Sequence, residues 1–211
     1  MAGPVELDAL DLAALLCSRV CHDLISPVGA VVNGMEVLEE TDDESTRLFA
    51  LDLIKKSASQ ASARLQFCRL AFGAAGSAGA EIDLGDAENV ARGFIQDDKV
   101  SLGWHLPRML LPKNRVKLLL NMLLLGTQII PRGGTITAEM IGEGASAGFR
   151  VTVRGLNARI PQAVPALVAG DADGPIDAHA VQPFYTGILA RTCGLRVAIE
   201  QEAEQVVVTA C

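Results

Sequence analysis

The chain has 211 residues, which is enough for one large domain or two small ones. Half of its residues are hydrophobic and a fifth are charged, so it can bury a substantial core. Its 25 acidic residues outnumber its 18 basic ones, and no basic run interrupts this balance. Nucleic acids and anionic membrane surfaces attract positive charge, so neither is expected as a partner.

Other sequence signals indicate a cytoplasmic protein. The longest apolar run, residues 118–130, is broken by polar residues and is too short to span a bilayer, so we expect no membrane insertion. The first ten residues have early acidic side chains and no basic region, unlike a secretory signal. The five cysteines are scattered without a Cys-x-x-Cys pair, which indicates reduced thiols rather than a disulfide framework or a zinc site.

Residues 5–40 show a long helical pattern, with Pro4 at its start. Apolar residues recur at alternating spacings of four and three, which is the a/d seam of a coiled coil or helix bundle. Thr41 followed by Glu44 has the spacing of a capping box and predicts a second seamed helix from there to about Phe72. The seam positions are Leu10, Ala14, Cys17, Cys21, Leu24, Val28, Val31, Met35 and Leu38, followed by Leu51, Ile54, Ala58, Ala61, Leu65, Cys68 and Phe72.

Two seamed helices joined by a short turn form an antiparallel hairpin. A single hairpin would leave too much apolar seam exposed, whereas two hairpins from two copies would close a four-helix bundle. The pattern therefore predicts a homodimer whose bundle is formed by residues 1–75.

The small-residue segment 73–80 is expected to be a linker, and the hydrophobic period changes after it. Helices are expected at 85–95, 112–130, 163–169 and 177–192, and strands at 100–106, 135–141, 149–154, 195–200 and 205–210. This order predicts an α/β sandwich with one helical layer over residues 81–211, and so an α+β chain overall.

His22 is the candidate reactive residue. It lies in the middle of the first predicted helix, beside the seam, and its own face carries Ser18, Ser26, Gly29 and Asn33 at offsets of −4, +4, +7 and +11. Because this stripe is small and polar, another protein could reach the imidazole. An ordinary exposed helix histidine would have the same spacing.

The other two histidines have simpler interpretations. His105, beside Trp104 in a predicted strand, is interpreted as a packed or surface histidine. The acidic segment 171–177 before His179 lacks the ligand alternation and terminal glutamate of a calcium loop, so it is interpreted as a solvated loop.

The string CHDLISPVGA, residues 21–30, contains His-Asp-Leu-x-Ser-Pro. It resembles the H-box of sensor histidine kinases, His-Glu/Asp-Leu-x-Thr/Asn-Pro-Leu, which that family carries on a bundle helix. Pro27 removes the N–H that would bond the carbonyl of Asp23, so we expect the helix to bend just past His22.

The second half of the chain extends this resemblance but lacks the nucleotide ligands. Residues 115–140, RVKLLLNMLLLGTQIIPRGGTITAEM, resemble a kinase N-box and its following strand, with Leu125 in place of the magnesium-ligating asparagine. Arg154, Gly155 and Asn157 occupy the next box, where the aspartate is absent, and the ATP-lid box is reduced to PFYTGILA around Gly187. Phosphoryl transfer from ATP depends on positioning and metal neutralisation, so its loss is expected here.

A bundle that carries a phospho-acceptor, joined to a degenerate ATPase domain, is similar to the ChpT-type histidine phosphotransferases of bacterial phosphorelays over essentially the whole chain. The resemblance implies a hairpin for dimerisation and phosphotransfer over residues 1–75 and a degenerate kinase-like ATPase domain over 81–211. It implies that His22 accepts phosphoryl from the receiver aspartate of a CckA-type hybrid kinase and passes it to CtrA- and CpdR-type response regulators, in cell-cycle regulation. No cofactor is expected in this chain, because the receivers bring their own magnesium.

The resemblance also implies roles for the neighbours of His22, whose Nε2 would be the attacking atom. An unperturbed imidazole is largely neutral near pH 7 and is then nucleophilic. Asp23 would orient or deprotonate the ring, or be structural. Ser26 would assist dephosphorylation of the receiver, or only keep the surface open.

The remaining members of the stripe are expected to contact the partner. Ser18, Gly29 and Asn33 would lie under a docked receiver. Arg19 would offset the phosphate charge, or be a plain solvated arginine.

Other classes of function remain open. An active ATP-dependent sensor kinase would need the nucleotide ligands that Leu125 and the altered boxes lack. A non-catalytic dimeric adaptor would explain the seams but would leave the H-box to coincidence. A small-molecule enzyme is not favoured, because the chain shows no nucleophile–base pair or phosphate loop.

Overall fold

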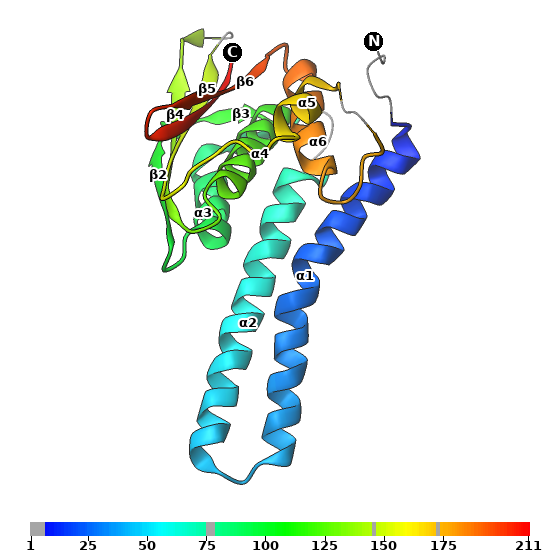
Figure 1. Cartoon of the computed structure of the whole chain (residues 1–211), viewed down its shortest axis with the longest axis vertical. Helices are drawn as coiled ribbons and strands as arrows, with labels where there is room; N and C mark the ends of the chain where they lie inside the picture. Colours follow the sequence, from blue (N-terminus) through cyan, green and yellow to red (C-terminus); the bar gives the residue numbers. More distant parts are fainter. Residues whose placement is uncertain (1–6, 75–78, 145–146, 172–173) are drawn as a thin grey trace.

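The computed structural model describes residues 7–74, 79–144, 147–171 and 174–211. A long helical hairpin is joined to a sheet that packs against helices (Figure 1). Pro4, Asp173 and residues 75–78 of the expected linker lie outside the described residues, so the expectations for them are not tested.

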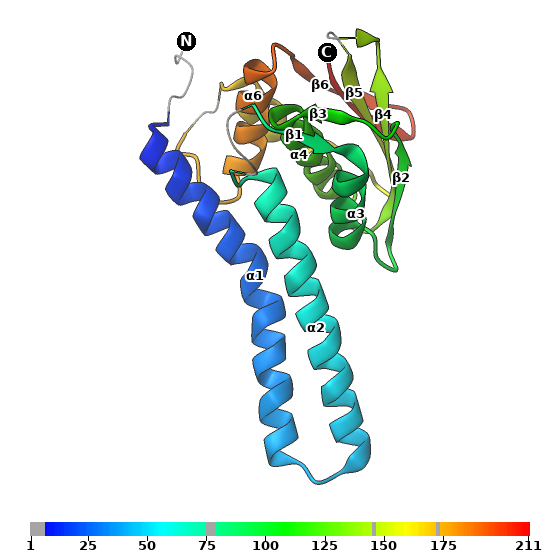
Figure 2. The same cartoon turned by 180° about the vertical axis from the view of Figure 1, so that it is seen from behind.

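The hairpin consists of helices α1 (Ala9–Glu40) and α2 (Glu44–Ala71), which run antiparallel in both views (Figures 1 and 2). α1 begins at Ala9 because the side chain of Asp8 accepts hydrogen bonds from the N–H groups of Leu10 and Asp11, both at 2.8 Å. The helix therefore starts later than residue 5.

The predicted capping box at Thr41 is wrong. Thr41 ends α1, because its N–H donates to the carbonyl of Val37. Asp43 caps α2 instead, and its carboxylate accepts from the N–H of Thr46 at 2.8 Å. A carboxylate is a strong acceptor at a helix N-terminus, where the helix dipole also favours negative charge.

The remainder of the chain contains a five-stranded sheet in the order β2-β4-β5-β7-β6. The β2–β4 pair is parallel and the other neighbours are antiparallel. The helices and strands of this C-terminal unit are β1 (Glu81–Asp83), α3 (Leu84–Ile95), β2 (Val100–His105), β3 (Leu110–Pro112), α4 (Lys113–Ile129), β4 (Gly134–Ile141), β5 (Gly148–Arg154), α5 (Val164–Ala169), α6 (Val181–Thr192), β6 (Val197–Glu202) and β7 (Gln205–Ala210).

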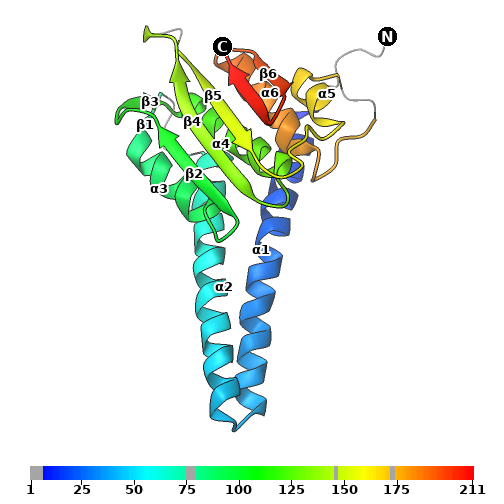
Figure 3. The same cartoon turned by 60° about the vertical axis from the view of Figure 1, so that its left-hand side comes forward.

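The predicted α+β class and the sandwich with one helical layer are confirmed. Helices α3 and α4 contact the sheet, and Figure 3 shows the sheet with helices behind it. Every expected helix and strand is present with small shifts at its ends. β1 and β3 were not predicted, because three residues are too few to show a period of two; they pair with each other in a separate small sheet.

Helix α4 is the centre of the C-terminal unit. It packs against β4, β5 and β7 on one side, and against α2, α3 and α6 elsewhere. A helix enclosed by neighbours must be apolar around its whole circumference, which explains its leucine-rich sequence. Leu125 is only 1% exposed within this core.

Helices α5 and α6 are in close contact. A Cβ atom at Gly187 would lie 2.0 Å from the carbonyl oxygen of Val168, so only glycine fits at this position of α6. The string that resembles a reduced ATP-lid box is therefore a packed helix.

By length and composition alone, α1 could span a bilayer, and among the described residues it is the single helix that meets this test. It packs along α2 and also contacts α6.

Candidate functional site

His22 lies on α1 with its side chain 59% exposed. The stripe predicted around it faces solvent: Ser18, Ser26 and Asn33 are exposed, and Gly29 is half-buried. A Cβ atom at Gly29 would meet no atom within 4 Å, so the surface near this residue is open. The imidazole is thus within reach of a second protein.

Asp23 is buried beside His22 and forms two side-chain contacts. Its Oδ2 accepts a hydrogen bond from Nε of Arg19 at 3.0 Å, and its Oδ1 lies 3.4 Å from Nδ1 of His22. A carboxylate beside Nδ1 favours the tautomer with its hydrogen there, which leaves the lone pair on Nε2. The side chain of Arg19 is only 17% exposed, so it is not the freely solvated arginine that one interpretation allowed.

The backbone of Asp23 is held by a residue that sequence reasoning missed. Pro27 is buried and has no N–H to donate to the carbonyl of Asp23. Nη1 of Arg64, on α2, donates to that carbonyl at 2.7 Å. α1 bends part-way along its length, as expected (Figure 1). A helix-internal proline predicts such an unpaired carbonyl, but the sequence does not show which side chain pairs with it.

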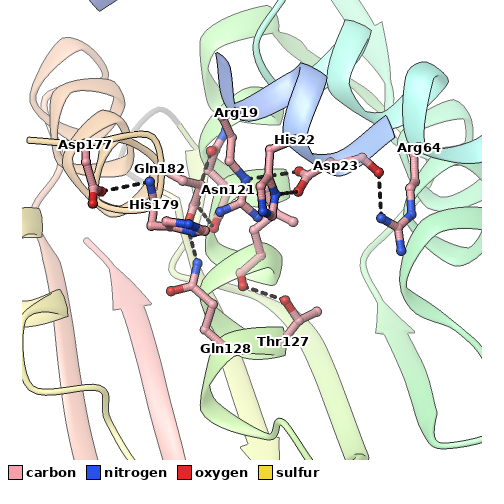
Figure 4. A network of polar contacts seen from close by, with 11 residues as sticks. Arg19, His22, Asp23, Arg64, Asn121, Thr127, Gln128, Asp177, His179 and Gln182 are labelled. Carbon is pink, nitrogen blue, oxygen red and sulfur yellow. Dashed lines mark hydrogen bonds and ion pairs between the residues drawn. The ribbon is translucent and has the colours of Figure 1, made fainter. Parts of the chain in front are cut away.

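His179 was also missed. Asp171, Asp177 and His179 are exposed, as the interpretation of a solvated loop implies, but Ile176 between them is buried. The folded chain also brings the ring of His179 against that of His22. The ring centroids are 4.9 Å apart and the ring planes meet at 79°, an edge-on contact (Figure 4). His105, by contrast, is exposed on β2 as expected, 3.7 Å from a carboxylate oxygen of Glu139.

A buried polar network connects the hairpin to the C-terminal unit. Asn121 of α4 is fully buried, and its Nδ2 donates to the carbonyl of Ala71 in the last turn of α2 at 3.1 Å. Nε2 of Gln182, in the first turn of α6, donates to Oδ1 of Asn121 at 3.1 Å. Gln128 donates in turn to Oε1 of Gln182 at 2.9 Å. Helices α2, α4 and α6 are therefore tied together (Figure 4).

The positions that resemble nucleotide boxes offer little to a ligand. Leu125 is in the core, whereas Arg154 and Asn157 are exposed, and Asn157 has a left-handed backbone with φ of 60°. Within the described ranges, no group of three or more His, Cys, Asp or Glu side chains is arranged to hold a metal ion.

Comparison with known proteins identifies related chains. Residues 84–205 match the family model described as the histidine phosphotransferase C-terminal domain. The chain is 53% identical to "Protein phosphotransferase ChpT" of Brucella abortus (strain 2308), over 211 residues that cover 100% of both chains. It is 50% identical to a solved bacterial phosphotransferase structure, with a TM-score of 0.91 and 100% of both chains covered.

The pairing of Arg64 with the Asp23 carbonyl predicts an energetic coupling to Pro27. Arg64→Met removes the donor and leaves a partly buried carbonyl unpaired, which should lower the free energy of unfolding by about 1–3 kcal/mol. In a Pro27→Ala background the restored N–H of residue 27 donates to that carbonyl. The loss of unfolding free energy caused by Arg64→Met should then be smaller than in the wild type, by at least about 1 kcal/mol. Urea denaturation at one fixed protein concentration measures both costs.

The exposed Lys55, on the same helix, provides the matched control Lys55→Met. This control should lower the free energy of unfolding only slightly, and by the same amount in the wild-type and Pro27→Ala backgrounds. An equal cost of Arg64→Met with and without Pro27 would contradict the assigned pairing.

Proposed function

The chain belongs to the ChpT-type histidine phosphotransferase family, and on this premise we propose that it relays phosphoryl groups between receiver domains through His22. Nε2 of His22 attacks the phosphorus of a phospho-aspartate in line, so that an N–P bond forms as the acyl-phosphate O–P bond breaks. The receiver's aspartate leaves as a carboxylate. The same steps in reverse deliver the phosphoryl group to the aspartate of the next receiver.

The observation that supports this proposal most directly is the exposed imidazole with its Nδ1 beside Asp23. Asp23 orients the ring and leaves Nε2 free for the attack. Because Arg19 pairs with the same carboxylate, the negative charge of Asp23 is balanced where a phosphoryl group must approach. Arg19 thereby offsets charge at the acceptor through Asp23.

The stripe along α1 is proposed as the receiver-docking surface. Ser18, Gly29 and Asn33 are small or of moderate size, so a second protein can approach the helix closely. Ser26, one turn beyond His22, would meet the phosphorylated aspartate of a docked receiver and assist its dephosphorylation. Magnesium would be supplied by the receiver.

The partners follow from the family assignment. We propose a CckA-type hybrid kinase as the phosphoryl donor and CtrA- and CpdR-type response regulators as acceptors, in cytoplasmic cell-cycle signalling. In this scheme residues 1–75 are the dimerisation and phosphotransfer domain, and residues 81–211 are a degenerate ATPase domain.

The apolar seams support a homodimer. Leu10, Val28, Met35, Leu51 and Leu65 all belong to the predicted seams and are 42% to 82% exposed in a single chain. Exposed apolar surface of this extent on two long helices indicates a protein interface. A second hairpin would cover it and form a four-helix bundle, so we assign the apolar face of α1 to this contact rather than to a membrane.

A groove between α1 and α2 is also mainly apolar. It has a volume of about 460 Å³. It is lined by Leu16 and Cys17 of α1, by Leu65 and Cys68 of α2, and by Phe72 just after α2. Burial raises the pKa of the Cys68 thiol to about 11, so the groove holds a neutral thiol at physiological pH. It would accept apolar side chains of the second copy.

Phosphotransfer is tested with two possible sources of label. The donor is a CckA-type hybrid kinase whose receiver has been phosphorylated with radiolabelled ATP and then freed of nucleotide; the second source is labelled ATP alone. We expect label on this protein from the receiver and none from ATP. His22→Ala should abolish the label, whereas His105→Ala, which removes an exposed histidine of β2, should leave it unchanged.

Each other result supports a different function. Label from ATP alone would make the protein an active kinase. Label on His22→Ala would refute His22 as the acceptor. No label from several different receivers would favour the non-catalytic adaptor.

The dimer is tested by replacing two exposed seam residues. The wild-type protein should have twice the 22.2 kDa chain mass in light scattering at micromolar concentration, and Met35→Glu/Leu51→Glu should have the mass of one chain. The control Leu156→Glu changes a residue of the C-terminal unit that is 72% exposed, and it should remain dimeric. A wild-type protein with the mass of a single chain would contradict the proposed bundle.

A further inference from the structure

The C-terminal unit contributes a side chain to the acceptor site. His179, in the turn before α6, lies edge-on to the ring of His22 with 4.9 Å between ring centroids (Figure 4). We propose that His179 is a positioning residue for phosphotransfer, which contacts the imidazole of His22 and holds it with Nε2 toward the docking receiver. This inference rests on the proposed role of His22 as acceptor.

The ring of His22 needs a second restraint. Its side chain is 59% exposed, and the 3.4 Å separation between its Nδ1 and Oδ1 of Asp23 is long for a hydrogen bond. Rotation about the side-chain bonds would turn Nε2 away from an incoming phosphorus. Asp23 contacts one ring nitrogen, and His179 contacts the ring from a different element. Together they limit rotation of the His22 side chain about χ1 and χ2.

The backbone of His179 is itself fixed by a capped turn. The carboxylate of Asp177 accepts hydrogen bonds from the N–H groups of His179 at 2.9 Å and Ala180 at 2.8 Å. The bond from Ala180 and then that from His179 lower the pKa of Asp177, so the cap is ionised at neutral pH. The N–H of Val181 donates to the carbonyl of Asp177 as α6 begins.

The region around His179 is anchored at two places. Gln182, three residues after His179, is fully buried and bonded to Asn121 of α4. In addition, a small apolar cluster joins the α5–α6 region to the first turns of α1 and to Leu7 just before it. Its members are Leu167, Ile176, Val181 and Phe184, packed against Leu7, Leu12, Leu15 and Leu16. The contact between the two histidines is therefore made by fixed elements.

A metal site does not explain this pair. Two imidazoles alone are too few ligands for a structural zinc, and no third Cys, His or carboxylate ligand joins them in the described part of the chain. A positioning role requires only the ring contact that the structure shows.

The test compares three variants in single-turnover transfer from a labelled phospho-receiver. His179→Ala removes the ring, His179→Phe retains an aromatic ring without its nitrogens, and His105→Ala is the matched control. We expect His179→Ala to lower the rate at saturating receiver by about 10- to 100-fold, because misaligned reactants lose most of the benefit of binding. Affinity for the unphosphorylated receiver should change less than about twofold, and His179→Phe should recover most of the rate.

Two results would overturn the inference. Transfer by His179→Ala at the wild-type rate would show that the ring contact is not needed. A rate for His179→Phe as low as that for His179→Ala would show that the aromatic contact is not the cause.

A second measurement separates this inference from the proposed function. This measurement uses NMR of the unphosphorylated protein labelled with ¹⁵N-histidine. Relative to the wild type, the ring ¹⁵N signals of His22 should shift in His179→Ala and not in His105→Ala. If they do not shift, the positioning role is refuted, whether or not phosphotransfer occurs. If they shift but no receiver labels the wild-type protein, the contact is supported and the proposed phosphotransfer is refuted.

Discussion

The buried side chain of Asn121 joins the two halves of this molecule, and the geometry around His22, the proposed acceptor, depends on it. Its amide donates to the carbonyl of Ala71 at the end of α2 and accepts from Gln182 at the beginning of α6. Because these groups are shielded from water, breaking one bond would leave a buried polar group unpaired. The C-terminal unit is therefore held in one orientation to the hairpin, and α6 meets α1 beside His22.

The proposed acceptor, His22, combines an exposed ring with a buried support. Another protein's aspartate must come within bonding distance of the ring, so the imidazole has to be accessible, yet an accessible side chain rotates easily. The ring nitrogen Nδ1 lies beside Asp23, whose carboxylate pairs with Arg19 and whose carbonyl pairs with Arg64. The C-terminal unit resembles an ATPase domain, but its core holds Leu125 where the resemblance expects a metal ligand. We propose that this unit supports the site at His22 instead.

The sequence predicted those features that depend on local patterns. Seam periodicity located both helices of the hairpin, the changes of period located the sandwich, and the H-box string located His22. The sequence did not predict contacts that depend on the folded chain. Arg64 faces the carbonyl freed by Pro27 only because α2 packs on α1, and His179 reaches His22 only through the packing of α6. Asp43 rather than Thr41 caps α2: its carboxylate accepts from the N–H of Thr46, whereas the hydroxyl of Thr41 accepts from the N–H of Asp43, before the helix begins. Spacing alone does not reveal this.

The most direct test of this account is to identify the ring nitrogen that carries the phosphoryl group. The protein, labelled with ¹⁵N-histidine, is phosphorylated by a receiver and studied by ³¹P and ¹H–¹⁵N NMR, which distinguish the two phosphohistidine isomers. We expect a phosphoramidate on Nε2 of His22, because Asp23 occupies the side of Nδ1. A phosphoryl group on Nδ1, or on any residue other than His22, would contradict it.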